Sequence, residues 1–328
     1  MPSTVTHSYF AMNVLEKLDD KTREFIRNDE NNFRVFAQSM DSFHFYDVLN
    51  IIKKKDLNII NFSEVFHSNK TGELLITLTE RIKNKKAYNN PHIMSFLYGL
   101  ICHYCLDSSA HPYIVYKSGE LDKKDKETWK YNAKHHEIEV SIDQYLINKK
   151  DKIKPNKYKH YDICLDFNDL DEESINIINY SFNKVHNFNN FYKHYTKSIY
   201  DMKFIFKHLR YDRYGILKNL YYIFDLVVPN PILRSKFLSY AYTIKNANYY
   251  LNENNKIWYN PADKNISSNK SFMELYDCAL DECVLIINSI KDYLYNDKII
   301  DLKKVYKNKS YITGLDSNKE NKLKYFEY

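Results

Sequence analysis

Apolar residues recur at helical spacing along most of the chain, and this pattern predicts a mostly helical protein. The first predicted helix spans Thr6–Leu18, where Phe10 and Val14 share one face with His7. The 328 residues include only 5 Gly and 7 Pro, too few for the many turns of a β-sandwich or barrel. The sequence therefore predicts an all-α fold.

Five further segments carry the same helical pattern. They are His92–Leu106, which runs on towards Asp107, Tyr131–Ile147, Asn176–His186, about Tyr200–Val227, and Ser271–Tyr295. The last segment opens with Ser271-x-x-Glu274, the spacing of a capping box. We expect residues 1–297 to form a single helical domain and the polar residues 298–328 to be peripheral.

The net charge of +6 is mildly basic and does not indicate a dedicated nucleic-acid partner. Two interpretations remain. The lysines are either scattered over a solvated surface, or they give a weak attraction to membrane surfaces and phosphate substrates.

The sequence shows no pattern typical of a targeting signal or of a disulfide framework. The start Met1-Pro2-Ser3-Thr4 lacks the basic and apolar regions of a signal peptide. The longest apolar stretch, Phe96–Leu106, is about half a membrane span. Five cysteines, an odd number, are thinly spread, and Cys102-x-x-Cys105 has no second pair to complete a metal site. We expect a soluble, reduced, cytoplasmic protein.

Histidines concentrate in the first part of the chain, where eight of the 12 lie between positions 7 and 136. His103 and Asp107 are four residues apart, as are His135 and Glu139. On a helix each pair shares one face, with Cβ atoms about 5–6 Å apart. Each pair could therefore bind a metal, or form a structural hydrogen-bonded pair.

The environment predicted for His103 and Asp107 favours the metal. The helix that carries them is apolar on nearly every face, so it should be buried. A buried carboxylate without a partner costs several kcal/mol or becomes neutral, and a divalent cation removes this cost. His111, taken alone, is more typical of a surface turn before Pro112 than of a metal ligand.

Several short segments that contain the histidines and carboxylates follow one another in an order typical of one enzyme family. In chain order they are Thr6–Phe10, Ala37–Asp41, Phe66–Thr71, Tyr98–Tyr113 and His135–Asp143, with a looser match at Trp258–Pro261 and Ser271–Phe272. In these segments the chain resembles the zinc-dependent phospholipase C family, whose superfamily also contains single-strand-specific zinc nucleases. The resemblance implies the helical fold of that superfamily.

The resemblance also implies two to three zinc ions. The first would be bound by Asp41, His67, His103 and Asp107, and the second by His111, His135 and Glu139. The third would be bound by His7, Asp107 and the amino group of the first residue, which would be Pro2 after removal of Met1. We expect ordinary packing for His44, His92 and His136, although His44 is near enough to Asp41 in sequence to support it.

The function implied by the resemblance is hydrolysis of a phosphate ester by a metal-activated water, with Asp41 orienting or deprotonating that water. The first hypothesis is phospholipase C-type release of a phospholipid head group. The second is nuclease or phosphomonoesterase activity at the same site, and the third is an inactive zinc-stabilised structural or binding protein. An intact ligand set favours an enzyme. With 31 tyrosines, aromatic residues alone cannot separate a lipid-binding rim from a base-stacking groove.

Overall fold

The computed structural model describes residues 4–48, 57–122, 124–227, 238–240, 247–296, 298–319 and 321–327, and most of them are helical. The α-helices are α1 (Thr4–Lys17), α2 (Asp20–Arg27), α3 (Glu30–Phe36), α4 (Leu57–Ser68), α5 (Thr71–Lys85), α6 (Pro91–Ser118), α7 (Trp129–Asp151), α8 (His160–Ile163), α9 (Glu172–His186), α10 (Phe191–Ile205), α11 (Ile216–Val227), α12 (Ala247–Leu251), α13 (Phe272–Tyr295) and α14 (Leu302–Tyr306). The predicted all-α fold is confirmed.

Short elements link these helices. Four are 3-10 turns, namely η1 (Ser39–Phe45), η2 (Ala87–Asn89), η3 (Lys126–Thr128) and η4 (Pro155–Lys157), and η5 (Phe206–Arg210) is a π turn. Strands β1 (Trp258–Tyr259) and β2 (Ser267–Ser268) form a small antiparallel hairpin.

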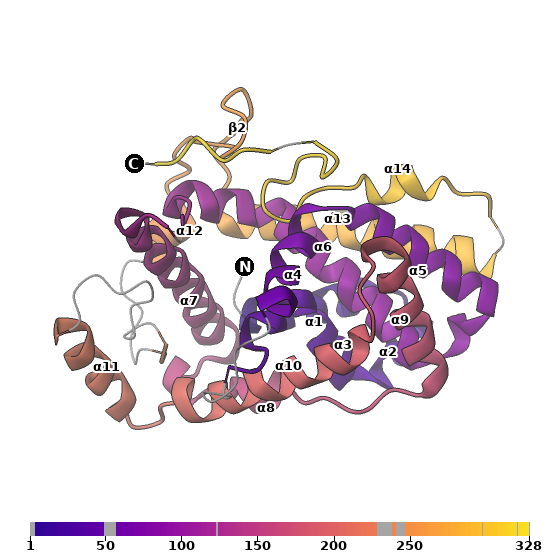
Figure 1. Ribbon diagram of the computed structural model, residues 1–328, viewed down its shortest axis with the longest axis horizontal. Coiled ribbons are helices and arrows are strands. Elements are labelled where there is room, and N and C mark those ends of the chain that lie inside the picture. Colours follow the sequence, from indigo (N-terminus) through magenta and orange to yellow (C-terminus); the bar gives the residue numbers. More distant parts are fainter. Residues whose placement is uncertain are drawn as a thin grey trace.

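Helix α6 lies at the centre of the fold and is buried along almost its whole length. The Asn90 side chain caps its first turn by accepting a hydrogen bond from the His92 amide, 3.0 Å away, and Pro91 follows at the first helical position. Helix α13 packs along α6, while α1, α3, α5 and α7 cover its other sides (Figure 1). A helix that is apolar on every face can only be stable in such a position.

The close packing of α3 on α6 depends on Gly99. A Cβ atom at this position would lie 2.7 Å from Phe36 Cβ and 3.0 Å from the Ala37 amide nitrogen, well inside van der Waals contact. The absent side chain lets the end of α3 approach α6 one turn before His103. The fold thereby brings the Ala37 carbonyl within reach of that histidine.

Helix α6 is longer than the predicted segment His92–Leu106. It continues through Pro112 and ends at Ser118. Pro112 has no amide hydrogen to donate to the Ser108 carbonyl one turn earlier. Gly314, with φ of +68°, approaches that carbonyl so closely that a Cβ would lie 2.4 Å from its oxygen. A buried environment on all sides thus keeps His111 helical, and the surface-turn alternative is wrong.

The prediction of one helix from Tyr200 to Val227 was wrong. Helix α10 ends at Ile205, the π turn follows, and α11 begins only at Ile216. Gly215 has a φ of +75°, and the Asp212 side chain accepts a hydrogen bond from the Lys218 amide at 2.7 Å. These two features start a new helix, because a carboxylate before the first turn caps free amide groups.

The C-terminal segment is more closely integrated than its polarity suggested. Leu302, Tyr306 and Tyr311 are buried, and the Tyr306 hydroxyl lies 2.7 Å from Thr79 Oγ1 on α5. The expectation that this segment is peripheral was therefore wrong for these side chains, because the segment uses aromatic residues to cover α5 and α6. The boundary proposed after residue 297 stays a prediction.

Helix α13 confirms the predicted capping box. The Ser271 side chain accepts a hydrogen bond from the Glu274 amide, and the Glu274 carboxylate accepts one from the Ser271 amide at 2.7 Å. Within the described part of the chain, no helix has both the length and the apolar character needed to cross a bilayer.

Candidate metal centre

Four side chains from three elements meet beside the middle of α6. Asp41 comes from η1, His67 from the end of α4, and His103 and Asp107 from adjacent turns of α6. One ligand atom from each lies within 4.8 Å of the others, and all four side chains are buried. We refer to these four residues as the first cluster.

Backbone carbonyls fix the orientation of both imidazoles in the first cluster. His67 Nδ1–H donates to the Ser63 carbonyl at 2.5 Å, and His103 Nδ1–H donates to the Ala37 carbonyl at 3.0 Å. Each ring then presents its Nε2 lone pair to the centre, in the arrangement typical of metal-bound histidine.

The atoms that converge at the centre repel one another unless a cation lies among them. The two Nε2 atoms of His67 and His103 are 3.3 Å apart. His67 Nε2 lies 2.9 Å from Asp41 Oδ1, and His103 Nε2 lies 3.2 Å from Asp107 Oδ2. Two lone pairs and two buried carboxylates therefore share one small volume, which requires positive charge.

The pKa values of the four side chains also show that the two carboxylates depend on nearby positive charge. Burial alone would raise the pKa of Asp41, but the imidazoles of His103 and His67, when protonated on Nε2, lower it below its usual value. The pKa of Asp107 lies far below its usual value because His103 and His7 outweigh burial. Burial lowers the pKa of His103, whereas the hydrogen bond to Asp41 outweighs burial and raises that of His67.

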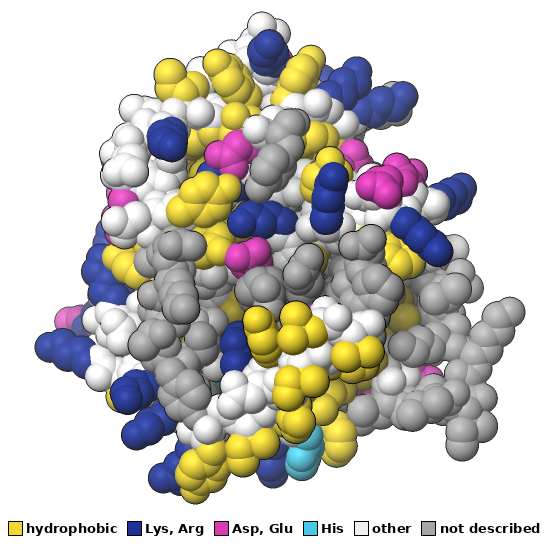
Figure 2. Space-filling view, turned by 90° about the vertical axis from the view of Figure 1, so that its left-hand side faces the viewer, with side chains coloured by type: hydrophobic (Ala, Val, Ile, Leu, Met, Phe, Trp, Pro, Cys, Tyr) yellow, Lys and Arg dark blue, Asp and Glu magenta, His cyan; other side chains and the backbone are white. Residues whose placement is uncertain are grey.

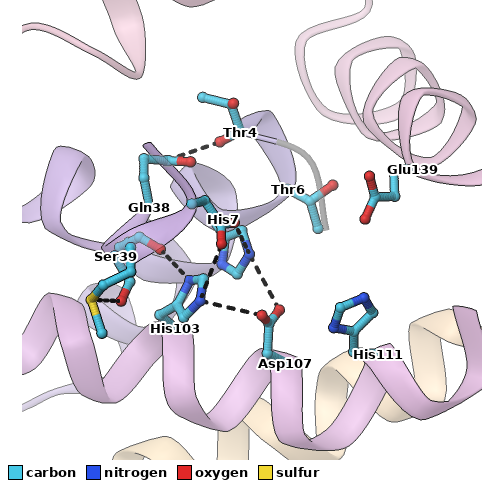
Figure 3. A network of polar contacts seen from close by, with 12 residues as sticks. Thr4, Thr6, His7, Gln38, Ser39, His103, Asp107, His111 and Glu139 are labelled. Carbon is cyan, nitrogen blue, oxygen red and sulfur yellow. Dashed lines mark hydrogen bonds and ion pairs between the residues drawn. The ribbon is translucent and has the colours of Figure 1, made fainter. Parts of the chain in front are cut away.

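His7 on α1 completes the surroundings of Asp107. His7 Nε2 lies 3.3 Å from Asp107 Oδ1, and the His7 ring stacks on His103 with centroids 4.4 Å apart (Figure 3). Among the described residues, neither ring nitrogen of His7 and neither oxygen of Asp107 makes a hydrogen bond, although all are buried. Asp107 thus offers one oxygen to each of two adjacent positions, and its donor set suits zinc.

A second cluster lies one turn further along α6 and comprises His111, His135 and Glu139. His111 Nε2 is 3.2 Å from His135 Nε2, which is 3.0 Å from Glu139 Oε1. His135 Nδ1 lies 3.1 Å from the Ser118 hydroxyl, which orients the ring with Nε2 towards its partners. Figure 3 shows His111 and Glu139 facing each other beside Asp107.

The structure brings together seven of the eight predicted ligands that it describes, in the groups predicted for the first and second zinc ions. The eighth, His7, lies beside Asp107 of the first cluster. Pro2 lies outside the described residues, so a ligand from the terminal amine stays a prediction. Metal ligation by the other residues also stays a prediction, and the geometry fits it.

The remaining histidines of the first part of the chain lie outside both clusters. His44 Nε2 lies 3.1 Å from the hydroxyl of Ser63, the residue whose carbonyl orients His67. His92 Nδ1 lies 3.0 Å from Asp171 Oδ2, in a hydrogen bond between α6 and the start of α9.

Asp143, for which the sequence pattern indicated no role, holds the start of α1 in place. Its carboxylate on α7 accepts hydrogen bonds from the Thr6 amide at 2.8 Å, the Thr6 hydroxyl at 2.6 Å and the Tyr240 hydroxyl at 2.7 Å. A carboxylate at a helix N-terminus also interacts favourably with the helix dipole. Since His7 follows Thr6, Asp143 positions that histidine. Its spacing of four residues from Glu139 on the same helix face was the available signal.

Tyr311 is a second residue that the sequence did not indicate. Its amide donates to the His67 carbonyl at 2.8 Å, and its ring packs edge-on against His67 and His103 at 5.3 Å. The segment that carries Tyr311 therefore forms one wall of the first cluster. One tyrosine among 31, far along the chain, gave no signal.

Comparison with known proteins identifies one family. A family model described as zinc dependent phospholipase C matches residues 6–188, more than half of the chain. The matched range contains both clusters, His7 and Asp143. No curated protein and no solved structure matches the chain.

Replacing Asp143 with asparagine should destabilise the protein by about 2 kcal/mol or more, because the new amide group would face hydrogen-bond donors in a buried site. Chemical denaturation measures this loss. Asp277→Asn is the matched control, since Asp277 is an exposed aspartate on α13. Equal unfolding free energies for the two variants would show that Asp143 does not anchor α1.

His135→Ala should remove zinc from the second cluster, whereas the neighbouring His136→Ala should leave zinc content unchanged. Only His135 converges with His111 and Glu139. Elemental analysis of the purified variants, with circular dichroism to verify folding, makes the comparison. Loss of zinc from His136→Ala but not from His135→Ala would mean that the helix register of the site is wrong.

Proposed function

Because the chain belongs to the zinc-dependent phospholipase C family, we propose that it hydrolyses the phosphodiester bond of a phospholipid and releases a phosphorylated head group. One observation carries the proposal: two clusters of imidazole and carboxylate groups lie side by side along α6. Asp107 of the first cluster and His111 of the second come from consecutive turns of this helix. Two close cation sites are suited to binding and polarising a phosphate ester.

The residues of the first and second clusters are suited to hold one zinc ion each. A third ion would lie between His7 and Asp107, and the amine of Pro2 would complete its ligands. Zinc bound there would supply Lewis acidity, which makes water a stronger nucleophile near neutral pH and draws electron density from phosphate oxygens. We propose two to three ions.

Asp41 is the residue proposed to act on the attacking water. Its Oδ1 faces His67 at 2.9 Å, whereas its Oδ2 lies 3.9 Å from His7, which is too far for a direct hydrogen bond. One oxygen can thus be held in the cluster while the other accepts a proton from water. Such general-base catalysis contributes about 10²–10⁴-fold to rate.

The balance of charge supports an anionic substrate. Asp41, Asp107 and Glu139 are the carboxylates of the two clusters, and two or three divalent ions exceed their combined negative charge. A phosphodiester brought to this position would supply the missing negative charge in a site largely shielded from water, where electrostatic attraction is strong.

A substrate panel tests the proposal. Zinc-loaded protein should hydrolyse a short-chain phosphatidylcholine or phosphatidylethanolamine, and a chelator should abolish the activity until zinc is restored. Single-stranded DNA and p-nitrophenyl phosphate are the competing substrates. Preferential hydrolysis of either one would replace the phospholipase proposal with a nuclease or phosphomonoesterase. Zinc-loaded protein that hydrolyses none of them would support the inactive, zinc-stabilised alternative.

A further inference from the structure

Helix α11 turns its apolar side chains towards solvent, whereas a helix that covers a core turns them inward. Ile216, Leu220, Ile223 and Val227 follow one another at helical spacing and form a single stripe. Each of these side chains is between 55% and 75% exposed, and no residue of α11 is buried. We refer to these four residues as the outer stripe.

Two polar residues of α11, Lys218 and Tyr221, contact the rest of the protein. Lys218 Nζ donates to the Ser239 carbonyl at 3.1 Å, and the Tyr221 hydroxyl donates to the Leu209 carbonyl at 2.9 Å. These contacts hold the helix with its apolar side turned outward. An arrangement of this kind has a free-energy cost in water, since four large aliphatic side chains remain solvated.

Aromatic residues extend the exposed apolar surface around the outer stripe. Tyr214, Tyr222 and Phe224 are more than half exposed. Figure 2 shows apolar side chains gathered in the lower part of this face of the molecule, with Lys and Arg side chains at its border. Contiguous apolar side chains exposed on a protein surface often mark an interaction site.

Basic residues surround the base of α11. Lys207 and Arg213 are exposed in the segment before the helix, and Lys157 and Lys159 are exposed in the connection after α7. The Asn156 side chain donates to the Arg213 carbonyl at 2.8 Å, which places this lysine-rich connection beside the start of α11. An apolar helix bordered by cations is complementary to a lipid surface that carries negative charge.

The length of α11 is also suited to a position along a membrane surface. Its 12 residues extend about 18 Å, short of the roughly 30 Å needed to cross the hydrocarbon layer. Exposed tyrosines favour the level of the lipid head groups, where an aromatic ring can be buried while its hydroxyl stays hydrated.

We propose that α11 docks the protein on an anionic lipid bilayer by inserting its outer stripe between the lipid head groups. The neighbouring lysines and arginine bind the lipid phosphates. This inference rests on the proposed phospholipase function for the identity of the surface, and it assigns α11 to capture of aggregated substrate. The metal centre, on other elements, would act on the lipid.

Vesicle flotation tests the docking directly. The full chain should bind vesicles of phosphatidylcholine mixed with phosphatidylserine, and it should bind less tightly when salt is added or phosphatidylserine is omitted. Leu220→Ser combined with Ile223→Ser should weaken binding about tenfold or more, because insertion of two large aliphatic side chains is lost. Leu285→Ser is the matched control, since Leu285 is 67% exposed on α13, and it should bind like the unchanged chain.

A parallel activity assay separates this inference from the proposed function. Hydrolysis of vesicle lipid should fall in the α11 double variant, whereas hydrolysis of a monomeric short-chain phospholipid should not change. Unchanged vesicle binding by the double variant would overturn the docking role of α11 and leave the proposed activity intact. Strong vesicle binding by a chain that hydrolyses no phospholipid would contradict the activity and retain the docking.

The alternative occupant of the outer stripe is a second copy of the chain. Sedimentation velocity without lipid tests it, and the docking proposal predicts the same sedimentation for the unchanged chain and the double variant. A dimer that the double variant disrupts, together with no vesicle binding, would overturn the proposal in favour of self-association.

Discussion

The structure is organised around a buried carboxylate that needs a cation. Asp107 is fully buried in the middle of α6, the helix at the centre of the fold, and each of its oxygens faces an imidazole nitrogen. A carboxylate in this position is stable only if positive charge is close, and its depressed pKa reflects that condition. The other buried groups of the two clusters have the same need for positive charge, so the proposed metal binding would also stabilise the core.

Other parts of the fold keep the ligand atoms oriented towards that charge. Gly99 lets α3 approach α6 closely enough for the Ala37 carbonyl to orient His103. Asp143 anchors the start of α1 next to His7, and Tyr311 closes the first cluster from the C-terminal segment. Supporting contacts of this kind fix the tautomer and direction of metal-binding histidines, and their loss typically weakens a site.

Local spacing was sufficient to predict some of the site, and tertiary contacts explain the rest. The pairs His103/Asp107 and His135/Glu139 could be predicted because residues four apart share a helix face. Asp41 and His67 came only from the family resemblance, since no local rule joins η1 to α4. The break between α10 and α11 was missed because a glycine with positive φ and a side-chain cap interrupt a continuous apolar pattern.

Diffraction from crystals of the purified protein, recorded on both sides of the zinc absorption edge, would show whether the two clusters bind zinc. We expect one anomalous peak enclosed by Asp41, His67, His103 and Asp107, and another enclosed by His111, His135 and Glu139. A zinc-supplemented crystal with no anomalous peak at either position, and with these side chains bonded only to one another, would contradict this expectation.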